Sequence, residues 1–185
     1  MLKQIGGRRG YAGREVIEGC CADDDAWALI AWDGWDDERW WELPDGRAID
    51  EVLAAGDLAS LPPLRLAFER GGRLGDILWS STPVAPIVSQ RFATVLADMG
   101  ATGYALVPLA TPEGIPPYFL LLLDDNDFDD VRAFPQGAQP VDRLDVSREV
   151  MAALRAAHAD CFHVEHAEAA SQRERMRQLT VAIPS

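Results

Sequence analysis

Hydrophobic and polar residues alternate in the first half of the chain in a way that predicts strands. Residues 64–69 read Leu-Arg-Leu-Ala-Phe-Glu, which has the period of two that is typical of a half-buried strand. Residues 26–32 form an apolar run that ends at Asp33-Gly34, a turn signal, and are also expected to be a strand. Between these two segments, residues 49–61 predict a short helix that stops at Pro62-Pro63.

A better-defined helix is predicted in the second half of the chain. Its apolar face is formed by residues at positions i, i+3, i+4 and i+7: Phe92, Val95, Leu96 and Met99. Ser89 precedes this face and can accept a backbone N–H as an N-cap, while Gly100 suits the C-terminal cap.

Two apolar strands follow this helix. Tyr104–Leu109 is the first, and a loop rich in proline and glycine at residues 112–117 separates it from Tyr118–Leu123. The second strand is apolar throughout, so we expect it to be buried on both faces.

The chain also contains a weak internal repeat. Residues 88–96 resemble residues 146–154, and both copies begin with Val-Ser and end with Leu. At the same offset Tyr104 aligns with Phe162, so each copy reads as an N-capped helix followed by a strand. Chance recurrence of helix–strand units is the alternative explanation. Together these elements predict an α+β fold with a mixed sheet, a few packed helices and a weak duplication of a helix–strand unit.

A single domain suits the length of 185 residues. Within residues 1–185, the first part, 1–62, is acidic and rich in tryptophan, and the second, 63–166, carries the clearest patterns. Residues 167–185 form a polar tail that is expected to be helical, with a short edge strand at its end.

Charge narrows the range of partners. The chain has 17 Lys and Arg against 30 Asp and Glu, which gives a net charge of −13. The phosphate backbone repels an acidic surface, so we expect no nucleic-acid partner. The same field would attract a basic protein and speed its capture, although solubility alone also explains an acidic surface.

Targeting and redox features point to the cytoplasm. The N-terminus lacks the apolar stretch of a signal peptide, and the longest apolar run is too short to span a membrane. Cys20, Cys21 and Cys161 are odd in number and two of them are adjacent, which argues against a disulfide framework. We expect a cytoplasmic protein with reduced cysteines and no membrane partner, and homodimer formation stays open.

No catalytic or metal motif is recognisable. Cys161, His163 and His166 lack the second spaced ligand pair of a zinc site. The acidic run of residues 124–130 does not match a calcium loop, because Phe128 would stand at a ligand position and Asp129 at the glycine position. We therefore expect no metal, no cofactor and no enzymatic activity. The run is either a solvated loop or a negative patch that meets basic residues of a partner.

Tryptophan is concentrated between residues 27 and 41, which hold five of the six. Trp27 and Trp32 lie in an apolar strand and are expected in the core. The others lie among charged residues, and tryptophan is enriched at binding hot spots. The predicted partner-binding residues are Trp35, Asp36, Asp37, Trp40, Trp41, Asp124, Asp125, Asp127, Asp129 and Asp130.

Several short motifs between residues 75 and 134 form a resemblance to a known family. They are Gly75-Asp76-Ile77-Leu78, Pro86-Ile87-Val88-Ser89-Gln90-Arg91-Phe92, Leu96, Val107-Pro108, Pro117-Tyr118-Phe119-Leu120 and the acidic segment ending at Val131, with Val146-Ser147 as a second Val-Ser helix start. This arrangement resembles immunity-protein family eleven of bacterial polymorphic-toxin loci. The resemblance implies an α+β fold and stoichiometric binding of a co-encoded toxin, and it supplies no catalytic residues.

Functions of different classes remain open at this point. The leading hypothesis is an immunity protein whose acidic, tryptophan-bearing surface occludes the active site of a toxin. A small hydrolase or transferase with paired carboxylates is the alternative, and it requires an apolar pocket with a shifted carboxyl pKa. A regulatory module that binds a small ligand is the third hypothesis.

Overall fold

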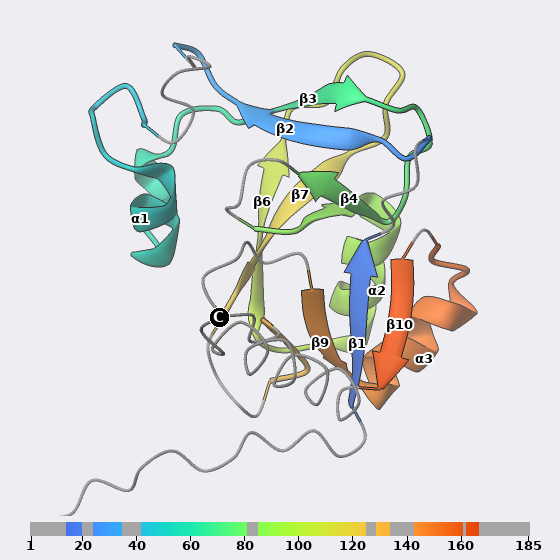
Figure 1. The fold of residues 1–185 in the computed structure, drawn as a ribbon. Coiled ribbons are helices and arrows are strands. Elements are labelled where there is room, and N and C mark those ends of the chain that lie inside the picture. Colours follow the sequence, from blue (N-terminus) through green and yellow to red (C-terminus); the bar gives the residue numbers. More distant parts are fainter. Residues whose placement is uncertain are drawn as a thin grey trace, which may run out of the picture.

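The computed structural model describes residues 14–19, 24–34, 42–80, 85–124, 129–133, 143–160 and 162–166. Within these residues three α-helices and two sheets form an α+β fold, as predicted (Figure 1). The prediction of one mixed sheet was incomplete, because the described strands divide between a mixed sheet and an antiparallel one.

Six strands make up the larger sheet, in the order β3-β2-β4-β5-β7-β6. Their bounds are β2 Trp27–Ala31, β3 Arg65–Arg70, β4 Ile77–Ser80, β5 Ile87–Ser89, β6 Tyr104–Leu109 and β7 Tyr118–Leu123. β2 and β4 run parallel, and the other neighbours run antiparallel. At one end the two edges of the sheet meet, because the backbone N–H of Ala110 donates to the Leu64 carbonyl and that of Leu66 to the Ala110 carbonyl, both at 2.9 Å. The sheet therefore curls back on itself.

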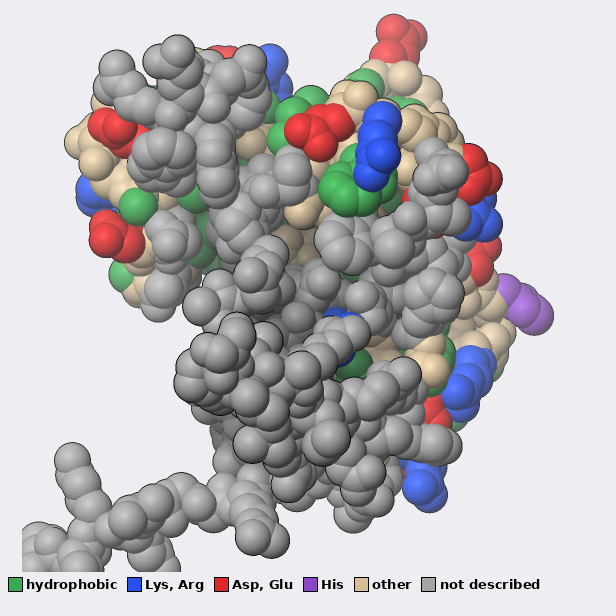
Figure 2. Space-filling view, in the orientation of Figure 1, with side chains coloured by type: hydrophobic (Ala, Val, Ile, Leu, Met, Phe, Trp, Pro, Cys, Tyr) green, Lys and Arg blue, Asp and Glu red, His purple; other side chains and the backbone are tan. Residues whose placement is uncertain are grey.

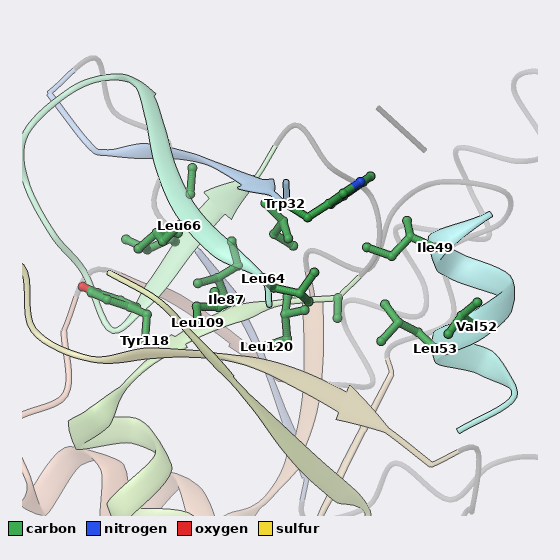
Figure 3. Close-up of a cluster of buried hydrophobic side chains, with 14 of the residues drawn as sticks. Trp32, Ile49, Val52, Leu53, Leu64, Leu66, Ile87, Leu109, Tyr118 and Leu120 are labelled. Atoms are coloured by element: carbon green, nitrogen blue, oxygen red, sulfur yellow. The ribbon is translucent and has the colours of Figure 1, made fainter. Parts of the chain in front are cut away.

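A first hydrophobic core packs against the strands of this curled sheet, with Ala28, Ile30, Leu66, Leu78, Ile87, Leu109 and Leu120 among its buried residues. Helix α1 (Ile49–Ala54) closes one side of it through Ile49, Val52 and Leu53 (Figure 3). The helix predicted for residues 49–61 is interrupted, because Gly56 has a φ of +68° and only a short 3-10 helix (Leu58–Ser60) follows.

The predicted core tryptophans differ in their burial. Trp32 is fully buried in the first core. Trp27 is only half-buried, and the guanidinium carbon of exposed Arg70 lies 4.0 Å from the centre of its ring. Trp27 therefore forms a cation–π pair at the surface of the sheet.

The smaller sheet has four antiparallel strands in the order β10-β1-β9-β8. Their bounds are β1 Arg14–Gly19, β8 Val131–Ala133, β9 Arg143–Ser147 and β10 Phe162–His166. Helices α2 (Gln90–Met99) and α3 (Arg148–Ala156) pack on each other, with α2 against the larger sheet and α3 against the smaller one. The second hydrophobic core joins them: Ile17, Ile77, Val88, Phe92, Leu96, Leu121, Val131, Leu144, Val146, Val150, Met151 and Leu154.

The weak repeat in the sequence corresponds to two structurally equivalent units. The first unit comprises β4, β5, α2, β6 and β7, with sheet order β4-β5-β7-β6, and the second comprises β8, β9, α3, β10 and β1, with sheet order β8-β9-β1-β10. The register agrees at each ladder, since Ile77 pairs with Val88 as Val131 pairs with Val146, and Leu106 pairs with Leu121 as Val164 pairs with Ile17. The N-terminal strand β1 thus occupies in the second unit the place that β7 occupies in the first.

Both helices are also capped in the same way. The Ser89 hydroxyl accepts the Phe92 N–H at 3.1 Å, and the Ser147 hydroxyl accepts the Val150 N–H at 3.3 Å. At the C-terminal ends, Gly100 and His158 both have left-handed φ values, +63° and +53°. The two units thus share sheet order, strand register and the caps at both ends of the helix, which favours a duplicated unit over a chance recurrence.

The strands predicted at residues 26–32, 64–69, 104–109 and 118–123 are all present, with ends shifted by one residue at most. Burial of β7 is only partly as expected, because Phe119, Leu122 and Leu123 are half-buried. The tail of residues 167–185 lies outside the described residues.

Candidate partner-binding surface

Three of the ten predicted partner-binding residues can be placed. Asp124, Asp129 and Asp130 belong to the described part of the chain, whereas Trp35, Asp36, Asp37, Trp40, Trp41, Asp125 and Asp127 lie outside it. Asp124 directly follows β7 and is exposed, and its backbone N–H donates to the Gly103 carbonyl at 3.0 Å. Its carboxylate is therefore presented to solvent from a fixed backbone position.

Asp129 is buried rather than exposed, so its side chain does not form part of a solvated acidic surface. It packs over Gly103, where a Cβ atom would lie only 2.3 Å from the Asp129 Cβ. Gly103 also has a φ of +89°, so both the close approach and the backbone conformation require glycine there.

Asp130 is half-buried and serves the contact between the two units. Its carboxylate accepts the Thr102 backbone N–H at 3.1 Å and the Thr102 hydroxyl at 3.3 Å. Its backbone carbonyl accepts the Ser147 N–H at 2.8 Å and an Arg14 guanidinium N–H at 3.2 Å. Asp129 and Asp130 thus have roles inside the fold, and only Asp124 of the described three is freely presented.

Asp76 in the first unit is equivalent to Asp130 in the second. Its carboxylate is bonded to two of the motif residues named in the sequence analysis, Ser89 and Arg91. It is fully buried, and its carboxylate accepts bonds from the Ser89 hydroxyl, the Arg91 guanidinium at 3.0–3.1 Å and the Asp160 backbone N–H at 2.7 Å. The bond to Asp76 raises the pKa of Arg91. Because Ser89 is occupied by capping α2 and by Asp76, this cluster holds the fold together.

A second ionic cluster has no counterpart in the first unit. Asp145 on β9 is fully buried between Arg14 at 2.6 Å and Arg132 at 2.7 Å. The register places Ile87, Leu78 and Tyr118 of the first core at the equivalent positions. These three charged residues could not be recognised in the sequence, because they are far apart in the chain and belong to no motif.

Exposed arginines of the described residues are largely neutralised by nearby carboxylates. The pairs are Arg47 with Asp45 and Asp57, Arg65 with Asp33, Arg73 with Asp24 and Asp25, Arg91 with Asp76 and Asp160, and Arg155 with Glu15. Figure 2 shows basic and acidic side chains interspersed on one face, with no gathered basic patch among the coloured residues. Hydrogen bonds from Arg47 lower the pKa of Asp45, and bonds from the Ser60 hydroxyl and then Arg47 lower that of Asp57.

Several exposed carboxylates have no such compensation. Within the described residues, five exposed acidic side chains form no ion pair: Glu69, Asp98, Glu113, Asp124 and Glu149. They contribute uncompensated negative charge to the surface formed by the described residues.

The described residues contain no group of three His, Cys, Asp or Glu side chains that could hold a metal ion. None of the described helices is long and apolar enough to cross a membrane. Comparison with models of known families, with curated proteins and with solved structures gives no match.

Proposed function

We propose that this protein is an immunity protein that binds a co-encoded bacterial toxin in the cytoplasm and occludes its active site. The proposal rests chiefly on the distribution of charge. The chain carries a net charge of −13. Within the described residues most exposed arginines are paired with carboxylates, whereas five exposed carboxylates form no ion pair. The surface therefore acts on a partner mainly through its negative field.

A negative surface suits the inhibition of a toxin that acts on nucleic acids or nucleotides. Such a toxin needs cationic groups to bind its phosphate-containing substrate. An acidic inhibitor uses the same cationic groups, so it competes directly with the substrate and is captured rapidly.

The binding surface proposed from the sequence is reduced by two residues. Asp129 is buried and the Asp130 carboxylate is bonded to Thr102, so neither carboxylate is kept in the proposed surface. Asp124 stays in the proposed surface, and so do the other seven residues predicted from the sequence: Trp35, Asp36, Asp37, Trp40, Trp41, Asp125 and Asp127. Aromatic anchors with a charged rim are the composition expected for tight protein–protein binding.

The test is inhibition of the purified toxin domain encoded by the adjacent gene. The full chain is titrated into the toxin while toxin activity is followed, and the complex is sized by light scattering. We expect toxin activity to fall to zero at one chain per toxin. We also expect light scattering to give the mass of a complex with one copy of each protein. Full toxin activity in the presence of excess folded chain would refute the proposal.

The same protein sample separates this function from the alternatives. A thermal-shift series with divalent metals and nucleotides is expected to leave the melting temperature unchanged, because selective binding to the folded state would raise it. Turnover of a small substrate by the isolated chain would support the carboxylate hydrolase instead.

A further inference from the structure

The loop between β6 and β7 is exposed over most of its length and is held by several hydrogen bonds. It comprises residues 111–117, of which Pro112, Glu113, Gly114, Pro116 and Pro117 are exposed. Figure 1 shows this yellow segment rising past β3 at the end of the larger sheet.

Hydrogen bonds hold the loop at both ends and across its middle. Ala110, just before it, is bonded to Leu64 and Leu66 at 2.9 Å, and the Pro117 carbonyl at its end accepts the Gln90 N–H at 3.0 Å. Within the loop, the Ile115 N–H donates to the Pro112 carbonyl at 3.1 Å, and the Thr111 hydroxyl donates to the Ile115 carbonyl at 3.2 Å.

Its side chains add to this order. Ile115 packs against the first core, and three prolines restrict φ along the segment. A segment that is already ordered loses little conformational entropy when it binds, so this loop is suited to insertion into a partner.

Glu113 stands at the turn of the loop with an uncommitted carboxylate. It is exposed and forms no ion pair or side-chain hydrogen bond with the described residues. The loop itself contains no basic residue, so the only charge it presents is negative.

Comparison of the two units shows that the ladder does not depend on this loop. In the second unit the equivalent pair, β10 and β1, keeps the same register, with His166 opposite Glu15 as Pro108 is opposite Phe119. Those two strands belong to opposite ends of the chain, so no loop of this kind joins them directly. The strand pairing therefore does not require a proline-rich, acidic connection. The composition of the loop between β6 and β7 is thus available for a role in binding.

We propose that residues 112–116 insert into a cationic recess of the partner protein, with Glu113 forming the ion pair at its centre. This inference rests on the proposed function, for which the recess is the substrate site of the toxin. It adds a rigid contact on the first unit to the acidic surface proposed from the sequence.

The test compares two charge reversals of equal size. Glu113→Lys changes the loop, and Asp98→Lys changes an exposed, unpaired carboxylate on α2, so both alter the net charge equally. Binding of each variant to the toxin domain of the adjacent gene is measured by surface plasmon resonance. Matching thermal unfolding curves verify that both variants are folded.

We expect E113K to weaken binding roughly tenfold to a hundredfold and D98K less than about threefold, because a charge at the centre of a contact matters more than one outside it. A photo-reactive residue at position 113 is expected to cross-link to the toxin, and one at position 98 is not. Equal, small effects of both variants while the unmodified chain still binds would overturn the loop proposal alone. Absence of binding by the unmodified chain would instead overturn the proposed function.

Discussion

The backbone N–H of Asp160 donates a 2.7 Å hydrogen bond to the Asp76 carboxylate, which ties the turn after α3 to the strand that opens the first unit. The reciprocal contact runs from the Thr102 N–H to the Asp130 carboxylate at 3.1 Å. Each unit is thus held by the aspartate that precedes the first strand of the other. The two contacts differ in burial, since Asp76 is fully buried and Asp130 is half-buried.

This difference predicts unequal losses of stability. Asp76→Ala is expected to lower the free energy of unfolding by about 3 kcal/mol or more, because it leaves the Ser89 and Asp160 donors and the Arg91 cation without their buried acceptor. Asp130→Ala is expected to cost about 1 kcal/mol, since solvent can replace its bonds. Urea unfolding of both variants measures the difference. Similar losses from the two substitutions would show that Asp76 does not have the central role assigned to it.

Because β1 occupies in the second unit the place that β7 occupies in the first, we expect β1 to contribute to the core as much as β7 does. Ile17 and Leu121 are equivalent and both are fully buried in the second core. Ile17→Ala and Leu121→Ala are each expected to lower the free energy of unfolding by about 2–5 kcal/mol, measured in urea. If Ile17→Ala changed stability by less than about 1 kcal/mol while Leu121→Ala were costly, β1 would be a peripheral strand.

The two helix ends predict a stabilising substitution. His158 has a φ of +53° at the position where the first unit has Gly100, and a residue with a Cβ is strained there. His158→Gly is expected to raise the free energy of unfolding by about 0.5–1 kcal/mol, because relief of this strain exceeds the entropy cost of glycine. Gly100→Ala is the matched control and should lose about 1 kcal/mol. A destabilised His158→Gly variant would mean that the His158 side chain makes a contact worth more than the strain.

The Arg47 pairs predict a stability difference that depends on pH. In the folded chain the pKa values of Asp45 and Asp57 are lowered. The unfolded chain therefore binds protons at these two aspartates at a higher pH than the folded chain does. Their contribution to stability is full above the usual aspartate range and is lost as the pH drops through the folded-state values. The melting temperatures of the unmodified chain and Arg47→Gln should therefore differ most near about pH 6 and converge toward about pH 2.

Arg148→Gln serves as the control for the Arg47 experiment. Arg148 is exposed and forms no ion pair with the described residues. The melting temperature of the Arg148→Gln variant should follow that of the unmodified chain at every pH. A constant gap between Arg47→Gln and the unmodified chain down to acidic pH would contradict the assignment.

Local patterns predicted those parts of the fold that local interactions determine. Helix α2 followed from its apolar face together with Ser89 and Gly100, because capping involves residues within a few positions. Strands β6 and β7 followed from apolar runs separated by a proline-rich loop.

Features that depend on distant pairing were not predictable in this way. β1 is short, and both of its neighbours lie more than a hundred residues away, so its position is set by the tertiary fold. The same is true of Asp145 between Arg14 and Arg132. The burial of Asp129 was also not predictable from the sequence, because an aspartate in an acidic run is usually solvated. The burial depends on the close approach of Gly103, which is distant in the sequence.

Protection of living cells is the most direct measurement of whether this chain neutralises a toxin. The toxin domain of the adjacent gene is induced in a bacterial host, with the full chain or with an empty vector, and colony counts are compared. The chain is expected to restore growth to the level of uninduced cells. Equal killing in both cultures, with the folded chain present at levels above the toxin, would contradict it.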